Sequence, residues 1–389
     1  MRVLMNAGPW LSVPPRGYGG IENVVATLVP PLRDLGVEVV LASVGTSTLP
    51  VDELLSVFPD GQFSALQRPY NQVCGVAQAH MHRVVRALRE RDDIDLVHDH
   101  VEAVGLATMA ALGRDAPPAL HTLHWDLAKH PELYGGFDGG GRVRVNGVSA
   151  SQLARAPEAL RAHSVGHVHL ATPLATGADR RPRPTKGDHL LILGRITPGK
   201  GQDLGARLAH EYGFDLILAG PVGPYHDPAD LPPDADNPDA RYFRERVAPH
   251  VDGQRVRWIG TVSGQERDEL VANAKAVLAP LRWEEPGGTF VVESLALGTP
   301  VVALARGCLP ELIEDGRTGL LTDDENELAE LALAADKIDP AECMAEAARR
   351  FTPARMASQY LELYERFIHS HSCNRVDTLS YGVGSRALP

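Results

Sequence analysis

The sequence predicts an α/β protein with two doubly wound domains, each a parallel sheet with helices on both faces. Short apolar runs alternate with helical stretches along most of the chain, which is the pattern of parallel βαβ units. The chain has 389 residues, enough for two domains with separate cores. Around residues 171–188 the alternation is interrupted by Thr, Pro, Gly and Arg, a composition typical of an interdomain linker.

Residues 1–170 form the first predicted domain. Its expected strands are 2–5, 38–43, 96–98, 119–123 and 144–148, and its expected helices are 22–35, 77–89 and 103–112. Ligands of such sheets bind at the carboxyl ends of the strands. Two domains of this kind are therefore expected to enclose a cleft between two sets of strand ends.

Residues 189–352 form the second predicted domain. Its expected strands are 190–193, 215–219, 256–259, 276–279 and 299–304, and its expected helices are 202–211, 241–251, 266–273, 291–298, 328–335 and 340–351. A further helix over 353–368 is expected to return toward the first domain. The polar tail, residues 369–389, is expected to be irregular and flexible.

Composition narrows the class of function. The net charge of −12 argues against nucleic-acid binding, which requires a basic face. No apolar run approaches the roughly 20 residues of a membrane span, and residues 1–8 lack the apolar core of a signal peptide, so we expect a cytoplasmic protein. The four cysteines have no metal or redox spacing and are expected to be free thiols.

The segment from Trp283 to Glu293 contains the most informative pattern. Glu285 and Glu293 flank seven residues, and the turn Pro286-Gly287-Gly288 directly follows the first carboxylate. Glu285 is expected on a loop at a helix N-terminus, and Glu293 about two turns into that helix, facing the same cleft. Free helix amides donate hydrogen bonds to a negatively charged phosphate, and carboxylates accept hydrogen bonds from sugar hydroxyls. The alternative is an ordinary turn with a chance pair of glutamates.

A second pattern follows the first strand of the second domain. Arg195 and Lys200 lie five residues apart on the glycine-rich loop 194–201, where they can converge on one anion. Arginine offers a bidentate fork and lysine a point charge, which together suit a diphosphate. The loop is not a Walker A sequence, because the Ser or Thr after the lysine is missing. Two exposed cations on a solvated turn are the alternative interpretation.

Further candidates follow other strands of both domains. Gly19 and Gly20 can bring backbone amides against an anion or sugar, although their loop lacks the dinucleotide fingerprint, so NAD is not expected. His100 and His124 end neighbouring strands. Zinc binding by these histidine clusters is not favoured, because no helix supplies a companion glutamate. Hydrogen bonding by neutral imidazole is expected, and a structural role is the alternative. The segment 307–311, with Glu311, is expected on the same cleft rim.

Together these segments resemble the retaining glycosyltransferases of the GT-B fold, family 4. The family pattern is a glycine loop, a Gly-Arg…Lys-Gly phosphate clamp, Glu-x7-Glu, Gly-Thr-Pro-Val-Val and Gly-x-x-Pro-Glu, and this chain has each in order. The resemblance covers roughly residues 1–368. By that resemblance, Arg195 and Lys200 hold the donor diphosphate, Glu293 binds the ribose, and Glu285 binds a hydroxyl of the transferred sugar.

The resemblance also implies roles for the remaining candidates. The amides of Gly287, Gly288 and Thr289 would face the sugar or phosphate, with the backbone of Thr261 and Val262 at the base and His124 near the anomeric centre. Gly19 and Gly20 would contribute to donor binding, and His100, Trp125 and Tyr18 would line the acceptor side or the pocket. No metal and no cofactor is implied beyond the nucleotide-sugar donor and a small-molecule acceptor.

One departure from the family pattern stands out. Many members have Glu-Pro-Phe-Gly where this chain has Glu285-Pro286-Gly287-Gly288, so the wall beside the sugar differs. This variant resembles the avilamycin-type actinobacterial branch of the family and implies a natural-product or other small-molecule acceptor. A sugar-nucleotide epimerase or hydrolase on the same fold and a non-catalytic nucleotide-sugar-binding protein are the alternatives to glycosyl transfer.

Overall fold

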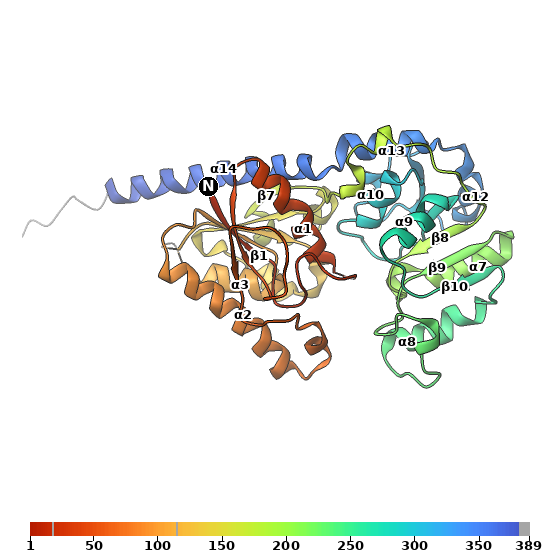
Figure 1. Ribbon diagram of the computed structural model, residues 1–389, viewed down its shortest axis with the longest axis horizontal. Helices are drawn as coiled ribbons and strands as arrows, with labels where there is room; N and C mark the ends of the chain where they lie inside the picture. The colour runs from red at the N-terminus through yellow and green to blue at the C-terminus, as the bar shows by residue number, and fades with distance from the viewer. Residues whose placement is uncertain (18, 114–115, 381–389) are drawn as a thin grey trace, which may run out of the picture. The chain divides into compact units, whose positions relative to one another are not determined.

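The computed structural model describes residues 1–17, 19–113 and 116–380, with the side chains of 67 and 370–380 left out. The chain divides into two compact units. The first contains Met1–Val148, Leu153–Val168 and the chain from Ala354, and the second contains Ser149–Gln152 and His169–Pro353. In each unit the strands form one sheet with helices on either side (Figure 1). Every named strand pair is parallel, which confirms the predicted fold class.

The sheet of the first unit has seven strands in the order β3-β2-β1-β4-β5-β6-β7. Its strands are β1 (Arg2–Asn6), β2 (Glu38–Ala42), β3 (Glu53–Leu55), β4 (Leu96–Asp99), β5 (Ala119–Leu123), β6 (Val143–Gly147) and β7 (Ser164–His167). Its helices are α1 (Gly20–Asp34), α2 (Tyr70–Glu90), α3 (Glu102–Ala111), α4 (Pro131–Gly135), α6 (Glu158–Arg161) and α14 (Pro353–Ser380). The residues of α5 (Ala150–Ala154) are divided between the first and second units. The short turns of the first unit are η1 (Phe63–Gln67), η2 (Leu127–Lys129) and η3 (Gly139–Gly141).

The strand order of the first unit reverses between β1 and β4. From β1 the chain moves outward to β2 and β3, then returns to β4 on the other side of β1 and continues outward to β7. Neighbouring loops diverge at such a reversal, so the carboxyl ends of β1, β4 and β5 form the expected ligand edge. The central strands are buried on both faces, in agreement with their nearly continuous apolar sequence.

The carboxy-terminal helix α14 lies along the first unit and is joined to its sheet by a buried polar network (Figure 1). The Tyr364 hydroxyl and His98 Nδ1 are 2.6 Å apart, and His98 Nε2 and Thr122 Oγ1 are 2.7 Å apart. The Tyr360 hydroxyl accepts a hydrogen bond from Asn146 Nδ2 at 3.1 Å and contacts Thr122 Oγ1 at 3.2 Å. Burial raises the pKa of both tyrosines, so each keeps the proton that this network uses.

The expectation of irregular chain from residue 369 is wrong as far as Ser380. Helix α14 continues through this polar stretch beyond the predicted end at residue 368. Polar, helix-compatible residues can propagate an established helix, because each added residue gains one backbone hydrogen bond. Residues 381–389 of the predicted tail lie outside the described residues.

The sheet of the second unit has six strands in the order β10-β9-β8-β11-β12-β13. Its strands are β8 (Leu190–Leu193), β9 (Leu216–Ala219), β10 (Val256–Trp258), β11 (Ala276–Ala279), β12 (Val301–Leu304) and β13 (Gly319–Thr322). Its helices are α7 (Gln202–Tyr212), α8 (Pro238–Tyr242), α9 (Gly264–Asn273), α10 (Thr289–Ala296), α11 (Leu309–Leu312), α12 (Leu328–Leu333) and α13 (Pro340–Arg350). Its short turns are η4 (Pro173–Ala175), η5 (Ala178–Arg180), η6 (Pro198–Lys200), η7 (Pro228–Asp230), the π-turn η8 (Phe243–Val247), η9 (Ala248–His250) and η10 (Ala334–Lys337).

The segment predicted as a linker, 171–188, belongs to the second unit. Ala175 and Ala178 are fully buried, and the amide of Thr172 donates to the carbonyl of Phe351 at 3.0 Å. The turns η4 and η5 pack against α10 and α13 through small side chains. The composition of this segment is typical of a linker, but the segment is attached to the core of the second unit.

Other differences concern element ends and sheet edges. The helix expected over 241–251 is broken into α8, η8 and η9, because Pro249 cannot donate a backbone hydrogen bond inside a helix. Glu293 is the fifth residue of α10, about one turn into the helix and not two. The edge strands β3, β7 and β13 had no strong apolar signal and were not predicted.

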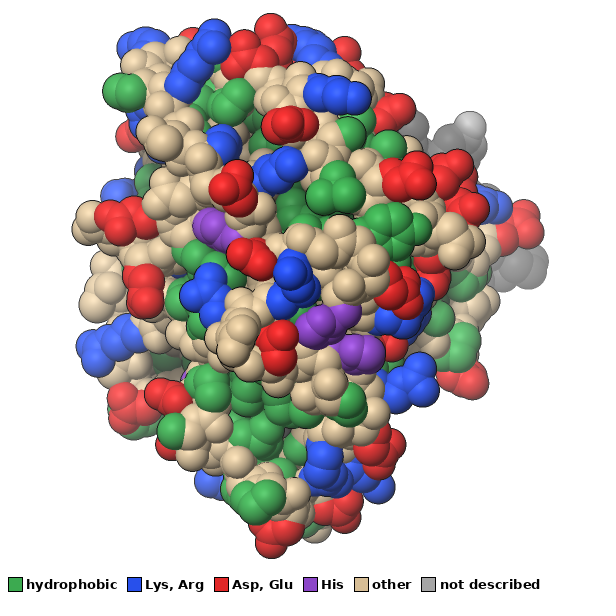
Figure 2. Space-filling model, turned by 90° about the vertical axis from the view of Figure 1, so that its right-hand side faces the viewer, with side chains coloured by type: hydrophobic (Ala, Val, Ile, Leu, Met, Phe, Trp, Pro, Cys, Tyr) green, Lys and Arg blue, Asp and Glu red, His purple; other side chains and the backbone are tan. Residues whose placement is uncertain are grey.

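Among the described residues, no helix is long and apolar enough to cross a membrane. Acidic and basic side chains are interspersed over the face drawn in Figure 2. Some exposed charges of the described residues form ion pairs, as between Arg207 and Glu211, whose Nη1 and Oε2 are 2.8 Å apart.

Candidate functional site

Two predicted site loops lie side by side in the second unit, at the carboxyl edge of its sheet. They follow β8 and β11, the neighbouring strands between which the strand order reverses. The amide of Arg282 donates to the carbonyl of Gly199 at 2.9 Å. Gly201 adopts a φ of +71°, and a Cβ there would collide with the carbonyl oxygen of Pro280. Only glycine permits so close a contact, which brings two sequence-distant loops together.

Lys200 lies at the meeting point of these loops. Its Nζ is 2.7 Å from Glu285 Oε2, and the two side chains are 22% and 11% exposed. The same Nζ lies over the rings of Trp283 and Phe290, 5.0 and 5.4 Å from their centroids. A carboxylate and two aromatic faces therefore hold the ammonium group in one position while part of it remains open to solvent.

Glu285 is fixed from both sides. Its Oε1 accepts a hydrogen bond from the amide of Gly288 at 3.3 Å, and its carbonyl accepts one from Cys308 at 2.8 Å. Gly307 has a φ of +60°, and a Cβ there would overlap the backbone of Glu285. The turn at 307–308, predicted on the same rim, thus directly positions the Glu285 loop.

The glycine pair beside Glu285 begins helix α10. Gly288 is its N-cap residue in the left-handed region, with a φ of 58°, where a larger side chain would also press on Leu312. Gly287 and Gly288 are buried, and Thr289, the first residue of the helix, is exposed. An exposed helix start with amides unused within the helix suits an anion or hydroxyl acceptor.

Arg195 differs from Lys200 in its surroundings. Its side chain is exposed, and within the parts of the chain that are described no group pairs with its guanidinium. Its carbonyl accepts a hydrogen bond from Gln202 Nε2 at 2.9 Å, which ties the loop to the start of α7. The guanidinium is thus available to an anion from solvent.

Glu293 pairs with a cation that sequence reasoning missed. Arg267 of α9 reaches both carboxylate oxygens at 3.3 Å, while it also binds Asp268 at 2.6 Å. Burial raises the pKa of Glu293 and the Arg267 guanidinium opposes that rise. No pattern in the sequence links a helix arginine to a glutamate on the next helix, so only the fold reveals this pair.

The segment after β10 carries the predicted base contacts. The amide of Thr261 donates to the carbonyl of His226 at 2.8 Å, and its Oγ1 lies 3.0 Å from His226 Nδ1. Thr261 is exposed and Val262 half-buried against the core. Gly260 has a φ of +75°, and a Cβ there would collide with the carbonyl oxygen of His226, so both the backbone conformation and the packing require glycine. The chain turns here with its backbone near solvent.

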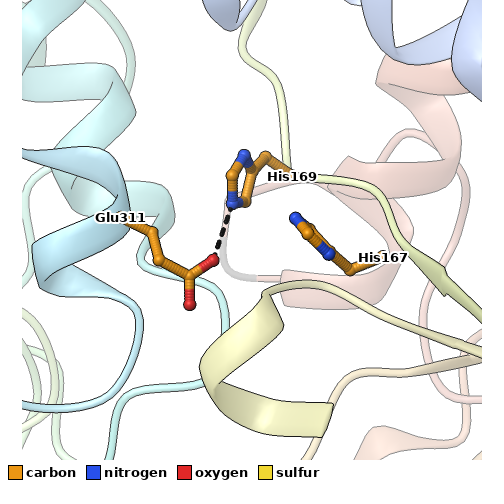
Figure 3. A group of neighbouring side chains, drawn as sticks. All are labelled: His167, His169 and Glu311. Carbon is orange, nitrogen blue, oxygen red and sulfur yellow. Dashed lines mark hydrogen bonds and ion pairs between the residues drawn. The ribbon is translucent and has the colours of Figure 1, made fainter. Parts of the chain in front are cut away.

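Glu311 forms a clamp within the second unit. Its carboxylate accepts hydrogen bonds from the amides of Ala150 and Ser151 at 2.9 and 2.6 Å, and lies 3.0 Å from His169 Nε2. Figure 3 shows the imidazole of His169 directed at this carboxylate. Burial opposes ionisation, but these hydrogen bonds outweigh it and lower the pKa of Glu311 to about 2. The sequence predicts Glu311 on the cleft rim beside the ligand groups, but in the structure its carboxylate already accepts hydrogen bonds from other groups of the protein.

In the first unit, the predicted glycine loop leads into α1. Gly19 is the N-cap residue, and a Cβ there would overlap Pro15, whereas Gly20 faces open space. Tyr18, predicted on the acceptor side, lies outside the described residues. Glu22, which sequence reasoning passed over, is buried in the first turn of the helix, and burial raises its pKa.

The two predicted histidines of the first unit are joined to each other. His100 Nδ1 and His124 Nε2 are 2.8 Å apart, and the rings stack with centroids 5.1 Å apart. Burial, reinforced by neighbouring histidines, holds the pKa of His100 well below its ordinary range and lowers that of His124 to about 3. Trp125 follows His124 and is half-buried, with Lys129 Nζ 4.5 Å from its ring centroid. Both imidazoles are therefore neutral at neutral pH, as expected for hydrogen bonding.

Sequence comparison assigns both halves of the chain. Residues 178–351 match the family described as glycosyl transferases group 1, and residues 18–157 match Glycosyltransferase Family 4. The first match contains all six strands of the second unit's sheet, and the second contains β2 to β6 of the first unit's sheet, so the two matches lie in the two domains of the GT-B fold. The chain is a family 4 glycosyltransferase. Its segments predicted by resemblance thus lie in the domains that define the family.

Relatives of this glycosyltransferase cover nearly its whole length. D-inositol 3-phosphate glycosyltransferase of Stackebrandtia nassauensis is 27% identical over 96% of this chain and 88% of the relative. The crystal structure of AviGT4, a glycosyltransferase involved in avilamycin A biosynthesis, is 28% identical with a TM-score of 0.62, covering 95% of this chain and 98% of that one. Anabaena Alr3699/HepE in complex with UDP-glucose shares the fold at 19% identity, with a TM-score of 0.64 and 94% and 100% of the two chains covered.

Proposed function

We propose that this glycosyltransferase transfers a sugar, with retention of anomeric configuration, from a nucleoside-diphosphate sugar to a small-molecule acceptor. The observation that carries the proposal is the fixed ammonium group of Lys200, held by Glu285 between two aromatic rings at the switch point of the second sheet. Ligands of doubly wound sheets bind at this edge. A cation held there is suited to the diphosphate of a donor.

In this proposal Lys200 and Arg195 neutralise the charge that develops on the departing diphosphate. The bond from the anomeric carbon to the phosphate oxygen breaks, and a bond to the acceptor oxygen forms on the same face of the sugar. The acceptor's proton passes to the departing phosphate oxygen. The two cations supply the positive charge that a divalent metal ion supplies in other enzymes, so no metal or cofactor is required.

The remaining donor contacts follow from the same placement. Glu285 accepts a hydrogen bond from a hydroxyl of the transferred sugar, and the amides of Gly287 and Thr289 face the sugar or the phosphate. The amide of Gly288, predicted to do the same, donates to Glu285 instead. Glu293, oriented by Arg267, accepts hydrogen bonds from the ribose hydroxyls. The backbone at Thr261 and Val262 meets the base.

For the acceptor we propose a small molecule of the natural-product class, bound by the first unit with His124 and Trp125. His100, predicted to line the pocket, is fully buried and bonded to His124, so its role is to support that ring. The support is the 28% identity with a glycosyltransferase involved in avilamycin A biosynthesis. A glycine in place of the phenylalanine that many family members have leaves more room beside the sugar. A cytoplasmic location completes the proposal.

A thermal-shift panel with UDP, GDP, ADP and dTDP tests the donor site. One of the four should raise the melting temperature, because a ligand that binds only the native state stabilises it by mass action. The Lys200→Ala variant should lose most of that shift. Lys275→Ala is the matched control, since Lys275 precedes β11 at the opposite end of the strand. No shift with any nucleotide would contradict the proposal. Breakdown of the matching nucleotide sugar without an acceptor would favour a hydrolase.

A further inference from the structure

Three side chains of the first unit form a row across adjacent strands at the carboxyl edge. Met5 lies on β1, His100 follows β4, and His124 follows β5. Met5 Sδ is 3.2 Å from His100 Nε2, and His100 Nδ1 is 2.8 Å from His124 Nε2. His100 thus has a different partner at each ring nitrogen.

The protonation of the two rings is constrained by burial. Met5 and His100 are fully buried. Burial holds the pKa of His100 well below its ordinary range, and burial together with His121 lowers the pKa of His124 to about 3. Near neutral pH each ring therefore carries a single N–H. Their mutual hydrogen bond then requires one ring to donate and the other to accept.

The sulfur of Met5 decides which ring donates. A thioether has lone pairs and no proton, so it can only accept. If His100 carried its proton on Nδ1, the lone pair of its Nε2 would face the lone pairs of Met5 Sδ, and both atoms would be buried without a partner. If His100 carries its proton on Nε2, it donates to Met5, and its Nδ1 accepts from the Nε2–H of His124. Only the second arrangement satisfies every polar atom in the row.

Nothing else that the structure describes competes for the nitrogens of His100. The neighbouring ring of His98 contacts its face, with centroids 4.1 Å apart, and both nitrogens of His98 are engaged by Tyr364 and Thr122. The Nδ1 of His124 has no partner in the described part of the chain. After the row is satisfied, that atom retains a lone pair.

We propose that Met5 and His100 are positioning residues that fix His124 as its Nε2–H tautomer, so that His124 Nδ1 is a hydrogen-bond acceptor. His124 then receives a hydrogen bond from a hydroxyl of the acceptor. It cannot donate one to a phosphate or carbonyl oxygen. This inference rests on the proposed function for its catalytic consequence, but the tautomer itself does not depend on that function.

Nitrogen-15 NMR of the histidine side chains in the full-length protein tests the proposal without any substrate. Long-range proton–nitrogen couplings distinguish the two tautomers directly. Wild-type protein should show His124 protonated on Nε2. Met5→Leu conserves volume and removes the sulfur acceptor, so both tautomers of His124 should become populated. Met109→Leu, a buried methionine of α3 outside the row, is the matched control and should leave the His124 signals unchanged.

Two results would overturn the proposal: an Nδ1–H tautomer of His124 in the wild-type protein, or unchanged His124 nitrogen shifts in Met5→Leu. Once an acceptor is known, kcat/KM for transfer should fall about twofold in Met5→Leu, in proportion to the fraction of His124 that retains the competent tautomer. A failure of the proposed function is distinguishable, because it would appear as absent nucleotide binding while the tautomer assignment remained intact.

Discussion

Replacing Glu311 with glutamine tests how much the carboxylate clamp stabilises the second unit. The side chain is 22% exposed, and its carboxylate binds His169 and the amides of Ala150 and Ser151. Its pKa is about 2 in the folded protein, against an ordinary value of 4.5. Such a difference corresponds to at most about 3 kcal/mol of stability. Partial solvent access screens the clamp, so we expect about 1–2 kcal/mol.

The pH dependence follows from the direction of the shift. Because folding lowers the pKa of Glu311, its stabilisation is fully present above the unfolded value of 4.5 and is lost as the pH falls toward 2. Glu311→Gln should therefore be about 1–2 kcal/mol less stable than wild type at pH 7. About half of that difference should disappear by pH 3, where the unfolded carboxyl is protonated.

Urea unfolding followed by tryptophan fluorescence at pH 7 and pH 3 measures both quantities. Glu330→Gln, an exposed glutamate of α12 in the same unit, controls for the general effect of removing one negative charge. A difference between Glu311→Gln and wild type that is equal at the two pH values would refute the ionised clamp. So would a variant no less stable at pH 7 than the control.

Three further predictions concern other parts of the fold and site. In urea unfolding, Gly307→Ala should destabilise the protein by at least about 2 kcal/mol more than Gly316→Ala. Both glycines have a positive φ, but only Gly307 lies against another backbone segment, so equal losses of stability would contradict this packing. Tyr364→Phe should cost about 1–3 kcal/mol, since it leaves a buried histidine nitrogen without its partner; an unchanged urea midpoint would count against the network. Arg267→Gln should weaken nucleoside-diphosphate binding about tenfold in calorimetry, with Arg267→Lys in between, because the charge on Glu293 loses its cation; unchanged affinity would remove Arg267 from the donor site.

Much of the fold could be predicted because the central strands are coded locally. The runs 119–123, 190–193 and 276–279 are strands with the predicted bounds, since each is an apolar segment buried on both faces. Edge strands such as β13 are short and half-exposed, so their sequence carries little apolar signal. The end of α14 was missed because its last residues show no core-facing pattern.

The site was predictable where strand ends determine it. Lys200 and Glu285 follow neighbouring strands, so a parallel sheet was bound to bring their loops to one edge. Partners that depend on side-chain direction were not predictable. Arg267 reaches Glu293 from another helix, and Met5 of β1 reaches His100, which follows the adjacent strand β4. Neither pair has a characteristic spacing in the sequence.

The central claim is that Lys200 holds the donor diphosphate, and the affinity difference between a nucleoside diphosphate and its monophosphate tests it most directly. The ligands are the diphosphate and monophosphate of the nucleoside selected in the thermal-shift panel, and Lys275→Gln is the control variant. Calorimetry should show that the wild-type protein and this control bind the diphosphate at least about tenfold more tightly than the monophosphate. Lys200→Gln should bind the monophosphate normally and lose most of that preference. Equal discrimination in Lys200→Gln and wild type would contradict the account.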